Sequence, residues 1–203
     1  MAPVKNILFD LGGVLLNLDV AQTRDAFIKL GVTQIDDLFR IGHAASFFKE
    51  YETGAISDQE FVEKARQLAH PGTTSDQIIA AWNVMLLDFP AERVQFLNLL
   101  KNKYRLFLFS NTNAIHLQAF HKSYQEVYGT AMDDLFEKAC YSHVINQRKP
   151  DVAAFQYVIK DCNIEARETL FIDDALVNIE GARKAGLQAV HLTGGKTILD
   201  LGL

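Results

Sequence analysis

The segment that begins at Asn6 constrains the fold of this chain more than any other. Four residues, three of them apolar, run into Asp10, and the glycines Gly12 and Gly13 follow. A short apolar run bounded by glycine is typical of a buried strand in a parallel sheet. Because ligands of open α/β sheets bind at the carboxyl ends of the strands, the pattern predicts Asp10 at a functional site. Taken alone, the pattern fits an aspartate in an ordinary turn at least as well. Later segments of the chain decide between the two interpretations.

Length and composition narrow the class of protein. A chain of 203 residues can form one sizeable core, or a core domain with a smaller insert. The net charge of −5 argues against nucleic-acid binding, which needs a basic surface. Cys140 and Cys162 show no metal-ligand spacing, and buried reduced thiols fit a cytoplasmic protein. We expect no signal peptide and no membrane span, since no apolar run approaches roughly 18 residues.

Residues 17–89 carry helical patterns and no strand signal. The first predicted helix has an apolar face that includes Val20. Helices at this spacing with short loops predict a small bundle inserted after the first strand. The predicted helices cover about 20–30, 35–42, 45–51, 58–68 and 76–85, and the expected N-caps are Asp19, Ser57 and Ser75.

From Pro90 to the end of the chain, helix and strand patterns alternate. Such alternation implies a parallel sheet with right-handed crossovers. The predicted fold class is therefore α/β, a Rossmann-like parallel sheet with helices on both faces. Asp174 is expected to cap the last helix. Strands are predicted at 106–109, 138–141, 169–172 and 188–192, and helices at about 90–100, 114–128, 150–162 and 175–186.

Polar side chains stand at three further junctions between strand and loop. Ser110 ends one strand pattern, and Asp173 and Asp174 follow another. Lys149 belongs to a loop, because the proline after it favours an extended backbone. If the strands are neighbours, their carboxyl ends bring these four residues together with Asp10.

This set of side chains is chemically coherent. Several carboxylates at one site repel each other unless a divalent cation binds them, and oxygen ligands suit Mg²⁺. A cation, a hydroxyl and an ammonium group together form a clamp for a transferring phosphoryl group. A carboxylate that faces the phosphorus can attack it and form an aspartyl-phosphate. The order of these residues, each at a predicted strand end, therefore indicates phosphoryl-transfer chemistry.

At these positions the chain resembles the haloacid dehalogenase superfamily of phosphohydrolases. The resemblance covers essentially the whole chain, and the helical insert falls where that family places a small cap domain. It implies a catalytic core of residues 1–16 and 90–203 and a helical cap of residues 17–89. The matching motifs are Phe9–Val14, Ser110–Asn111, Lys149–Pro150, and Phe171–Asp174 with Asn178.

The resemblance also implies roles for individual residues. Asp10 would be the nucleophile and a Mg²⁺ ligand, and the backbone carbonyl of Gly12 would be another ligand. Asp173 and Asp174 would complete the metal shell. The residues implied to hold the phosphoryl group or to line the substrate site are Ser110, Lys149, Asn111, Gly12 and Gly13.

One departure from the family pattern concerns Gly12. Most phosphatases of the superfamily have a second aspartate there, which serves as general acid and base. Such help is typically worth about 10²–10⁴ in rate. Its absence implies a slower or more selective enzyme, and it argues against a phosphomutase. Three runs, 10–14, 52–57 and 110–113, are similar to a subgroup that lacks this aspartate and includes bacterial α-D-glucose-1-phosphate phosphatases.

The leading prediction is thus a Mg²⁺-dependent phosphatase of a small phosphorylated metabolite. A sugar 1-phosphate is favoured because its leaving group needs less protonation. Within the cap, His43, Phe47 and Tyr51 are candidate walls for the sugar, although the two aromatic residues fit cap core as well. Two alternatives stay open: a metal-independent 2-haloacid dehalogenase that uses Asp10 on carbon, and a non-catalytic phosphoryl-binding regulator. The sequence does not define the oligomeric state.

Overall fold

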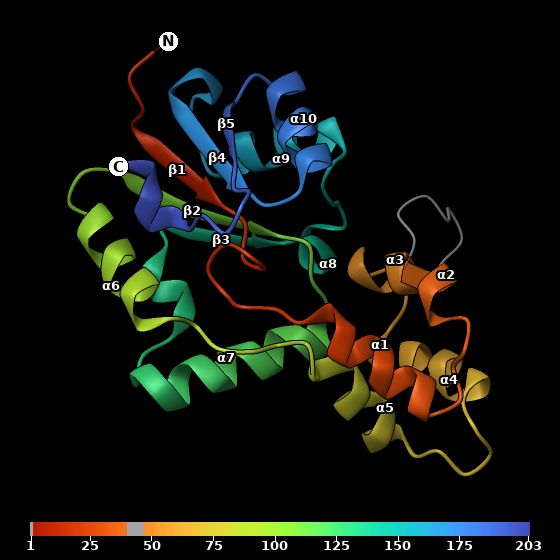
Figure 1. The fold of residues 1–203 in the computed structure, drawn as a ribbon. Coiled ribbons are helices and arrows are strands. Elements are labelled where there is room, and N and C mark those ends of the chain that lie inside the picture. Colours follow the sequence, from red (N-terminus) through yellow and green to blue (C-terminus); the bar gives the residue numbers. More distant parts are fainter. Residues whose placement is uncertain (1, 40–46) are drawn as a thin grey trace.

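Five parallel strands form a sheet in the order β3-β2-β1-β4-β5 (Figure 1). This arrangement comes from a computed structural model, which describes residues 2–39 and 47–203. It confirms the predicted α/β fold class and places β1 at the centre, so that Asp10 follows the middle strand. The strands are β1 (Asn6–Phe9), β2 (Arg105–Ser110), β3 (Lys138–Tyr141), β4 (Thr169–Asp173) and β5 (Gln188–His191).

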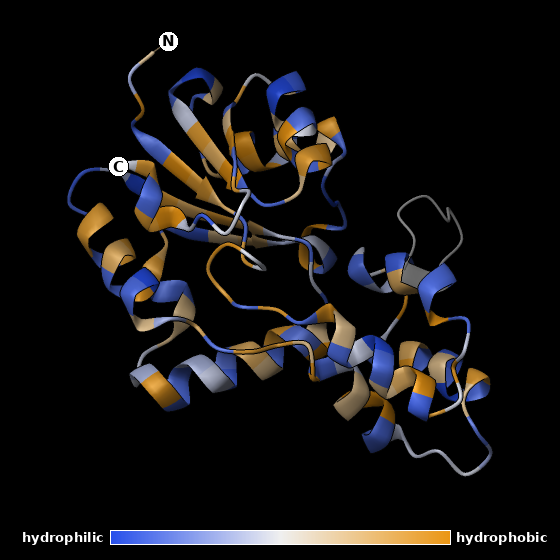
Figure 2. Cartoon of the chain, in the orientation of Figure 1, coloured by the Kyte–Doolittle hydropathy of each residue, from blue (hydrophilic) through white to orange (hydrophobic). Residues whose placement is uncertain are grey.

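Helices cover both faces of this sheet. Ile7 and Phe9 of β1 pack toward α6 (Ala91–Leu100) and α7 (Ala114–Tyr128), whereas Leu8 packs toward the helices of the opposite face. Successive side chains of a strand point to opposite faces, so a centre strand must be apolar throughout. Figure 2 shows the strands mainly in the hydrophobic colour. The opposite face is covered by α9 (Val152–Asp161) and α10 (Leu176–Lys184).

The described part of residues 17–89 is helical and contributes no strand to the sheet. Its helices share an aromatic cluster in which Phe27, Phe48, Phe61 and Trp82 are buried. Ile115, from the start of α7, completes that cluster, so the helical segment packs directly on the rest of the chain (Figure 1). The helices are α1 (Val20–Lys29), α2 (Ile35–Phe39), α3 (Phe47–Glu52), α4 (Asp58–Leu68) and α5 (Ser75–Asn83).

Of the three N-caps predicted in residues 17–89, two are confirmed and one is wrong. Asp19 accepts a hydrogen bond from the Ala21 backbone, and Ser57 forms a capping box with Glu60. Ser75, however, is the first residue of α5, and Thr74 caps it with Gln77. The reason is geometric, because the Thr74 hydroxyl reaches the backbone N–H three residues ahead.

Other differences are small. Val20 was placed on the apolar face of its helix but is 47% exposed. The fourth-strand pattern extends one residue further than predicted, to Asp173, and α9 begins two residues after Pro150. The ends of two predicted helices, at 42 and 45, lie outside the described residues. Helices too short for a periodic signal were missed: α8 (Ser142–Ile145), η1 (Met132–Leu135), η2 (Ala166–Glu168) and η3 (Ile198–Leu201).

Cys140 and Cys162 are free and buried, as expected. Within the described ranges, no helix combines the length and the apolar character that crossing a bilayer requires.

Candidate active site

Asp10 stands at the carboxyl end of the sheet with a fixed backbone. Its N–H donates to the carbonyl of Ile172 over 2.9 Å, which extends the ladder between β1 and β4 by one residue. Asp173 closes β4 and Ser110 closes β2, the two strands on either side of β1, and both residues are buried. The sheet therefore brings three predicted site residues to one edge, as the strand-end argument required.

The turn after Asp10 makes room for another carboxylate. Gly13 has a φ of +72°, and a Cβ added there would lie 2.3 Å from Oδ2 of Asp174. A side chain at Gly13 would be strained and would displace the carboxylate. The absence of a side chain at Gly13, which is predicted to line the substrate site, thus leaves room for the carboxylate of Asp174.

Lys149 lies at the centre of the site. Its Nζ is 2.7 Å from Oδ1 of Asp10 and 2.7 Å from Oδ2 of Asp173. The side chain is 1% exposed, and the rings of Phe109 and Phe171 lie 5.5 and 5.3 Å from Nζ. Burial opposes the charge, but attraction to the two carboxylates outweighs it and raises the pKa of Lys149. A buried, ionised lysine thus links the predicted nucleophile, Asp10, with a predicted metal ligand, Asp173.

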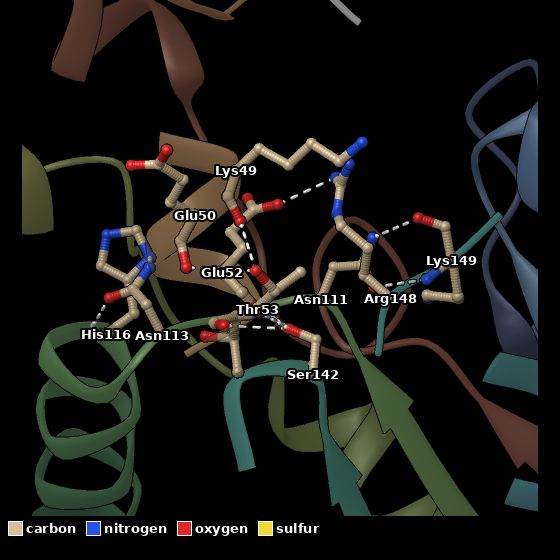
Figure 3. Close-up of polar contacts among 11 residues, drawn as sticks. Lys49, Glu50, Glu52, Thr53, Asn111, Asn113, His116, Ser142, Arg148 and Lys149 are labelled. Carbon is tan, nitrogen blue, oxygen red and sulfur yellow. Dashed lines mark hydrogen bonds and ion pairs between the residues drawn. The ribbon is translucent and has the colours of Figure 1, made fainter. Parts of the chain in front are cut away.

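The side chain of Asn111 forms two hydrogen bonds with the backbone of Lys149. Its Nδ2 donates to the carbonyl of Lys149 over 3.0 Å, and its Oδ1 accepts from the N–H over 2.9 Å. Figure 3 shows this paired contact. Asn111 is predicted to line the substrate site. The structure shows that its side-chain amide bonds the backbone of Lys149 on both sides and so fixes the loop of that lysine.

Asp173 is saturated with hydrogen bonds. Asn178 donates to both of its oxygens, over 3.1 and 3.0 Å, and the N–H of Ala175 donates to Oδ1 over 2.8 Å. Asp174 was predicted to cap the last helix, and this was wrong. Ala175 occupies the N-cap position of α10, and Asp173 is the residue whose side chain accepts from it. Asp174 is therefore left with its carboxylate facing Gly13.

Three carboxylates meet at this edge. Ligand oxygens of Asp10, Asp173 and Asp174 all lie within 4.8 Å of one another. Burial raises the pKa of Asp10 to about 7, with Lys149 opposing the shift and Asp173 adding to it. Burial and the charge of Asp173 likewise raise the pKa of Asp174. Such crowding of hard oxygen donors is unfavourable without a cation and fits Mg²⁺.

The three residues of the helical segment that are candidates to contact the sugar lie in different environments. Tyr51 is buried; its hydroxyl accepts from the N–H of Ile115 over 3.1 Å and donates to Asp58 over 2.6 Å. It belongs to the core of that segment and does not form a wall. Phe47 is half-buried and stacks on Phe48 with ring centres 4.5 Å apart. His43 lies outside the described residues.

Sequence reasoning missed one charged pair beside the site. Neither Arg148 nor Glu52 is a candidate site residue from the sequence. Nη2 of Arg148 lies 2.8 Å from Oε2 of Glu52 (Figure 3). Their opposite charges are visible in the sequence, but the two residues lie 96 positions apart, which gives no reason to pair them.

Comparison with known proteins agrees with this geometry. The profile of the haloacid dehalogenase-like hydrolases matches residues 4–186. A D-ribitol-5-phosphate phosphatase of Bacteroides thetaiotaomicron is 29% identical over 192 residues, covering 95% of this chain and 93% of its own. A glyceraldehyde 3-phosphate phosphatase of Pyrococcus abyssi is 26% identical over 204 residues, covering 95% and 83%.

Solved structures extend the similarity to three dimensions. A crystal structure of a wild-type enzyme of that family from Bacteroides thetaiotaomicron, in complex with magnesium and inorganic phosphate, superimposes with a TM-score of 0.90. Its sequence is 34% identical, and the match covers 98% of this chain and all of the other.

Proposed function

Because this chain belongs to the haloacid dehalogenase-like hydrolases and is a Mg²⁺-dependent phosphatase of small phosphorylated metabolites, we propose that Asp10 is its nucleophile. The observation that carries this assignment is the position of Lys149, 2.7 Å from both Asp10 and Asp173. The ammonium group orients the attacking carboxylate and balances part of the negative charge that collects there.

The proposed reaction has two steps. An oxygen of Asp10 bonds to phosphorus while the bond to the leaving oxygen breaks, which gives an aspartyl-phosphate and an alkoxide that takes its proton from water. Water then attacks phosphorus, releases inorganic phosphate and regenerates the carboxylate. Ser110, at the end of β2, and Lys149 would hold the phosphoryl oxygens. With Gly12 in place of an acid, no carboxyl at that position shares in these proton transfers.

The oxygen donors at the sheet edge define the proposed cation site. Asp10, Asp174 and the backbone carbonyl of Gly12 would hold Mg²⁺. Asp173 is a weaker candidate for direct contact, since four hydrogen bonds already occupy its two oxygens. When bound, Mg²⁺ supplies positive charge that stabilises the transferring phosphoryl group.

We further propose the division of the chain into a core of residues 1–16 and 90–203 and a cap of residues 17–89. The separate aromatic cluster of α1–α5 supports it. The free thiols of Cys140 and Cys162 support a reducing, cytoplasmic location.

For the substrate, we propose a small sugar 1-phosphate. Without an acid at Gly12, esters with acidic leaving groups should react faster, and an anomeric oxygen leaves more easily than that of a primary alcohol. The names of the two curated relatives favour a second candidate, a primary phosphate of a short polyol or aldehyde. The two classes differ in leaving group and can be compared directly.

The test is turnover of a matched panel with and without Mg²⁺. We expect higher kcat/KM for glucose 1-phosphate than for glucose 6-phosphate and D-ribitol 5-phosphate, and loss of all turnover with EDTA. Preference for D-ribitol 5-phosphate would support the second candidate. Metal-independent release of halide from 2-chloropropionate would revive the dehalogenase alternative, and no turnover of any ester would favour a phosphoryl-binding regulator.

A further inference from the structure

The ion pair between Glu52 and Arg148 differs from the others on this protein. Its side chains are 26% and 25% exposed. Apart from the two ion pairs of Lys149, every other ion pair between described residues has at least one side chain that is 44% exposed or more. Exposed pairs contribute little because water screens them, whereas a partly buried pair fixes two groups more firmly.

The pair also joins two distant segments. Glu52 ends α3 in the proposed cap, and Arg148 lies in the loop between α8 and α9 of the proposed core. The backbone around Glu52 is held on the same surface. The hydroxyl of Ser142 donates to the carbonyl of Glu52 over 2.6 Å (Figure 3). In addition, Nδ2 of Asn146 donates to the carbonyl of Thr53 over 3.0 Å.

The turn after Glu52 fits this surface too closely to shift without cost. Gly54 has a φ of +69°, and a Cβ there would lie 2.3 Å from the carbonyl oxygen of His143. The backbone that carries Glu52 is thus held in place, and this fixes the position from which its carboxylate reaches Arg148.

Arg148 directly precedes Lys149, the residue at the centre of the site. The backbone of Lys149 is held by Asn111, and its Nζ lies between Asp10 and Asp173. A displacement of this loop would move the ammonium group relative to both carboxylates. A displacement of about 1 Å in a catalytic site can reduce the rate by roughly 10²-fold.

We propose that Glu52 is a positioning residue for the phosphatase reaction: from the cap it fixes Arg148 and so holds the loop that carries Lys149. The inference rests on the proposed function, in which Lys149 binds the transferring phosphoryl group. Glu52 itself touches no reacting atom in this scheme. It acts on the chemical step and much less on substrate affinity.

The experiment is a double-mutant cycle of Glu52→Gln and Arg148→Met, with p-nitrophenyl phosphate and Mg²⁺ for kinetics and urea unfolding for stability. We expect Glu52→Gln to lower kcat by about 10-fold or more and to change KM by less than about 3-fold. The double variant should be no slower than Arg148→Met alone, and Glu52→Asp should recover part of the rate. As a control, Glu137→Gln breaks the exposed pair with Arg105 and should leave kcat unchanged.

Three results would overturn the proposal: an unchanged kcat in a folded Glu52→Gln variant, additive effects in the cycle, or a lower rate explained by the unfolded fraction. If Glu52→Gln does not fold, Arg148→Lys tests the same contact with the charge retained. If the parent protein turns over no ester, the proposed function fails, and the urea-unfolding arm of the cycle tests the contact by itself. Additive free energies of unfolding for Glu52→Gln and Arg148→Met would then show that the two side chains are not coupled, which contradicts the positioning role.

Discussion

At the scale of single residues, the reaction depends on which carboxylate is free to attack. Asp173 accepts four hydrogen bonds. By contrast, the described ion pair between Asp10 and Lys149 involves only Oδ1 of Asp10. We expect Asp10→Asn to lower kcat by about 10³-fold or more while the urea midpoint stays near that of the parent, because shape is preserved and the nucleophile is lost. Steady-state turnover and trapping of labelled phosphoenzyme measure it. Parent-like turnover would remove Asp10 from the nucleophile role.

The metal assignment can be separated from the nucleophile. Asp174 faces Gly13 at the carboxylate cluster, and among the described contacts its side chain accepts a hydrogen bond only from its own backbone. Asp174→Ala should raise the Mg²⁺ concentration for half-maximal activity by roughly 10–100-fold. A Mg²⁺ titration of activity measures this, with the exposed Asp76→Ala as control. An unchanged titration would transfer the ligand role to Asp173.

The sequence predicted the identity of these residues better than their contacts. Asp10, Ser110, Lys149 and Asp173 were found because a parallel sheet brings strand ends together. The clamp of Asn111 on Lys149 could not be foreseen, because it joins two loops whose approach depends on the folded path of the chain. The capping error at Asp174 has the same origin, since either of two adjacent aspartates can reach the next helix.

At the scale of elements, periodicity predicted long segments well. The helix expected at 114–128 is α7 with the same bounds, and the strand expected at 138–141 is β3. α8 escaped prediction because four residues carry less than two turns of pattern. Thr74 and Ser75 are both good caps, and only the folded backbone selects between them.

The start of α7 carries a buried histidine with a defined charge state. The ring of His116 stacks on Trp82, and its Nε2 forms a hydrogen bond of 3.0 Å with the backbone carbonyl of Trp82. Burial lowers the pKa of His116 to about 4. The unfolded chain takes up a proton below about pH 6.5 and the folded protein does not. The contribution of His116 to stability should therefore fall as pH drops from about 6.5 to 4, by about 3 kcal/mol at most, and then level off. The raised pKa of Asp10 contributes in the opposite direction between about pH 7 and 4, so the effect of His116 has to be measured as a difference between two variants.

Urea unfolding at pH 4.5, 5.5, 6.5 and 7.5 tests this linkage. His116→Gln should be less stable than the parent at pH 7.5, because two hydrogen bonds and the stacked ring are lost. The stability difference between the parent and His116→Gln should shrink as pH falls from 6.5 to 4.5. His70→Gln, at an exposed site, should differ from the parent by a constant amount over that range. A constant difference for His116→Gln as well would show that His116 does not contribute to the pH dependence.

At the scale of the whole molecule, the helical segment and the sheet are tied together at one end of α7. Trp82 donates from Nε1 to Oδ1 of Asn113 over 3.2 Å, and the same oxygen accepts from the backbone of His116. Tyr51 bonds the backbone of Ile115, which completes the aromatic cluster. Because these contacts follow Ser110 and Asn111 directly, the proposed cap is anchored beside the candidate active site.

This anchoring predicts that both parts unfold together. Trp82 is the one tryptophan of the chain, so its fluorescence reports on α5, whereas far-UV circular dichroism reports on all helices and strands. In the parent protein we expect the two urea transitions to coincide, the usual sign of a single cooperative unit. Tyr51→Phe leaves the N–H of Ile115 and the carboxylate of Asp58 without that hydroxyl, which should cost about 1–3 kcal/mol and move the fluorescence transition to lower urea. If fluorescence already changes first in the parent, the helical segment unfolds independently, and the contacts at α7 do not couple it to the sheet.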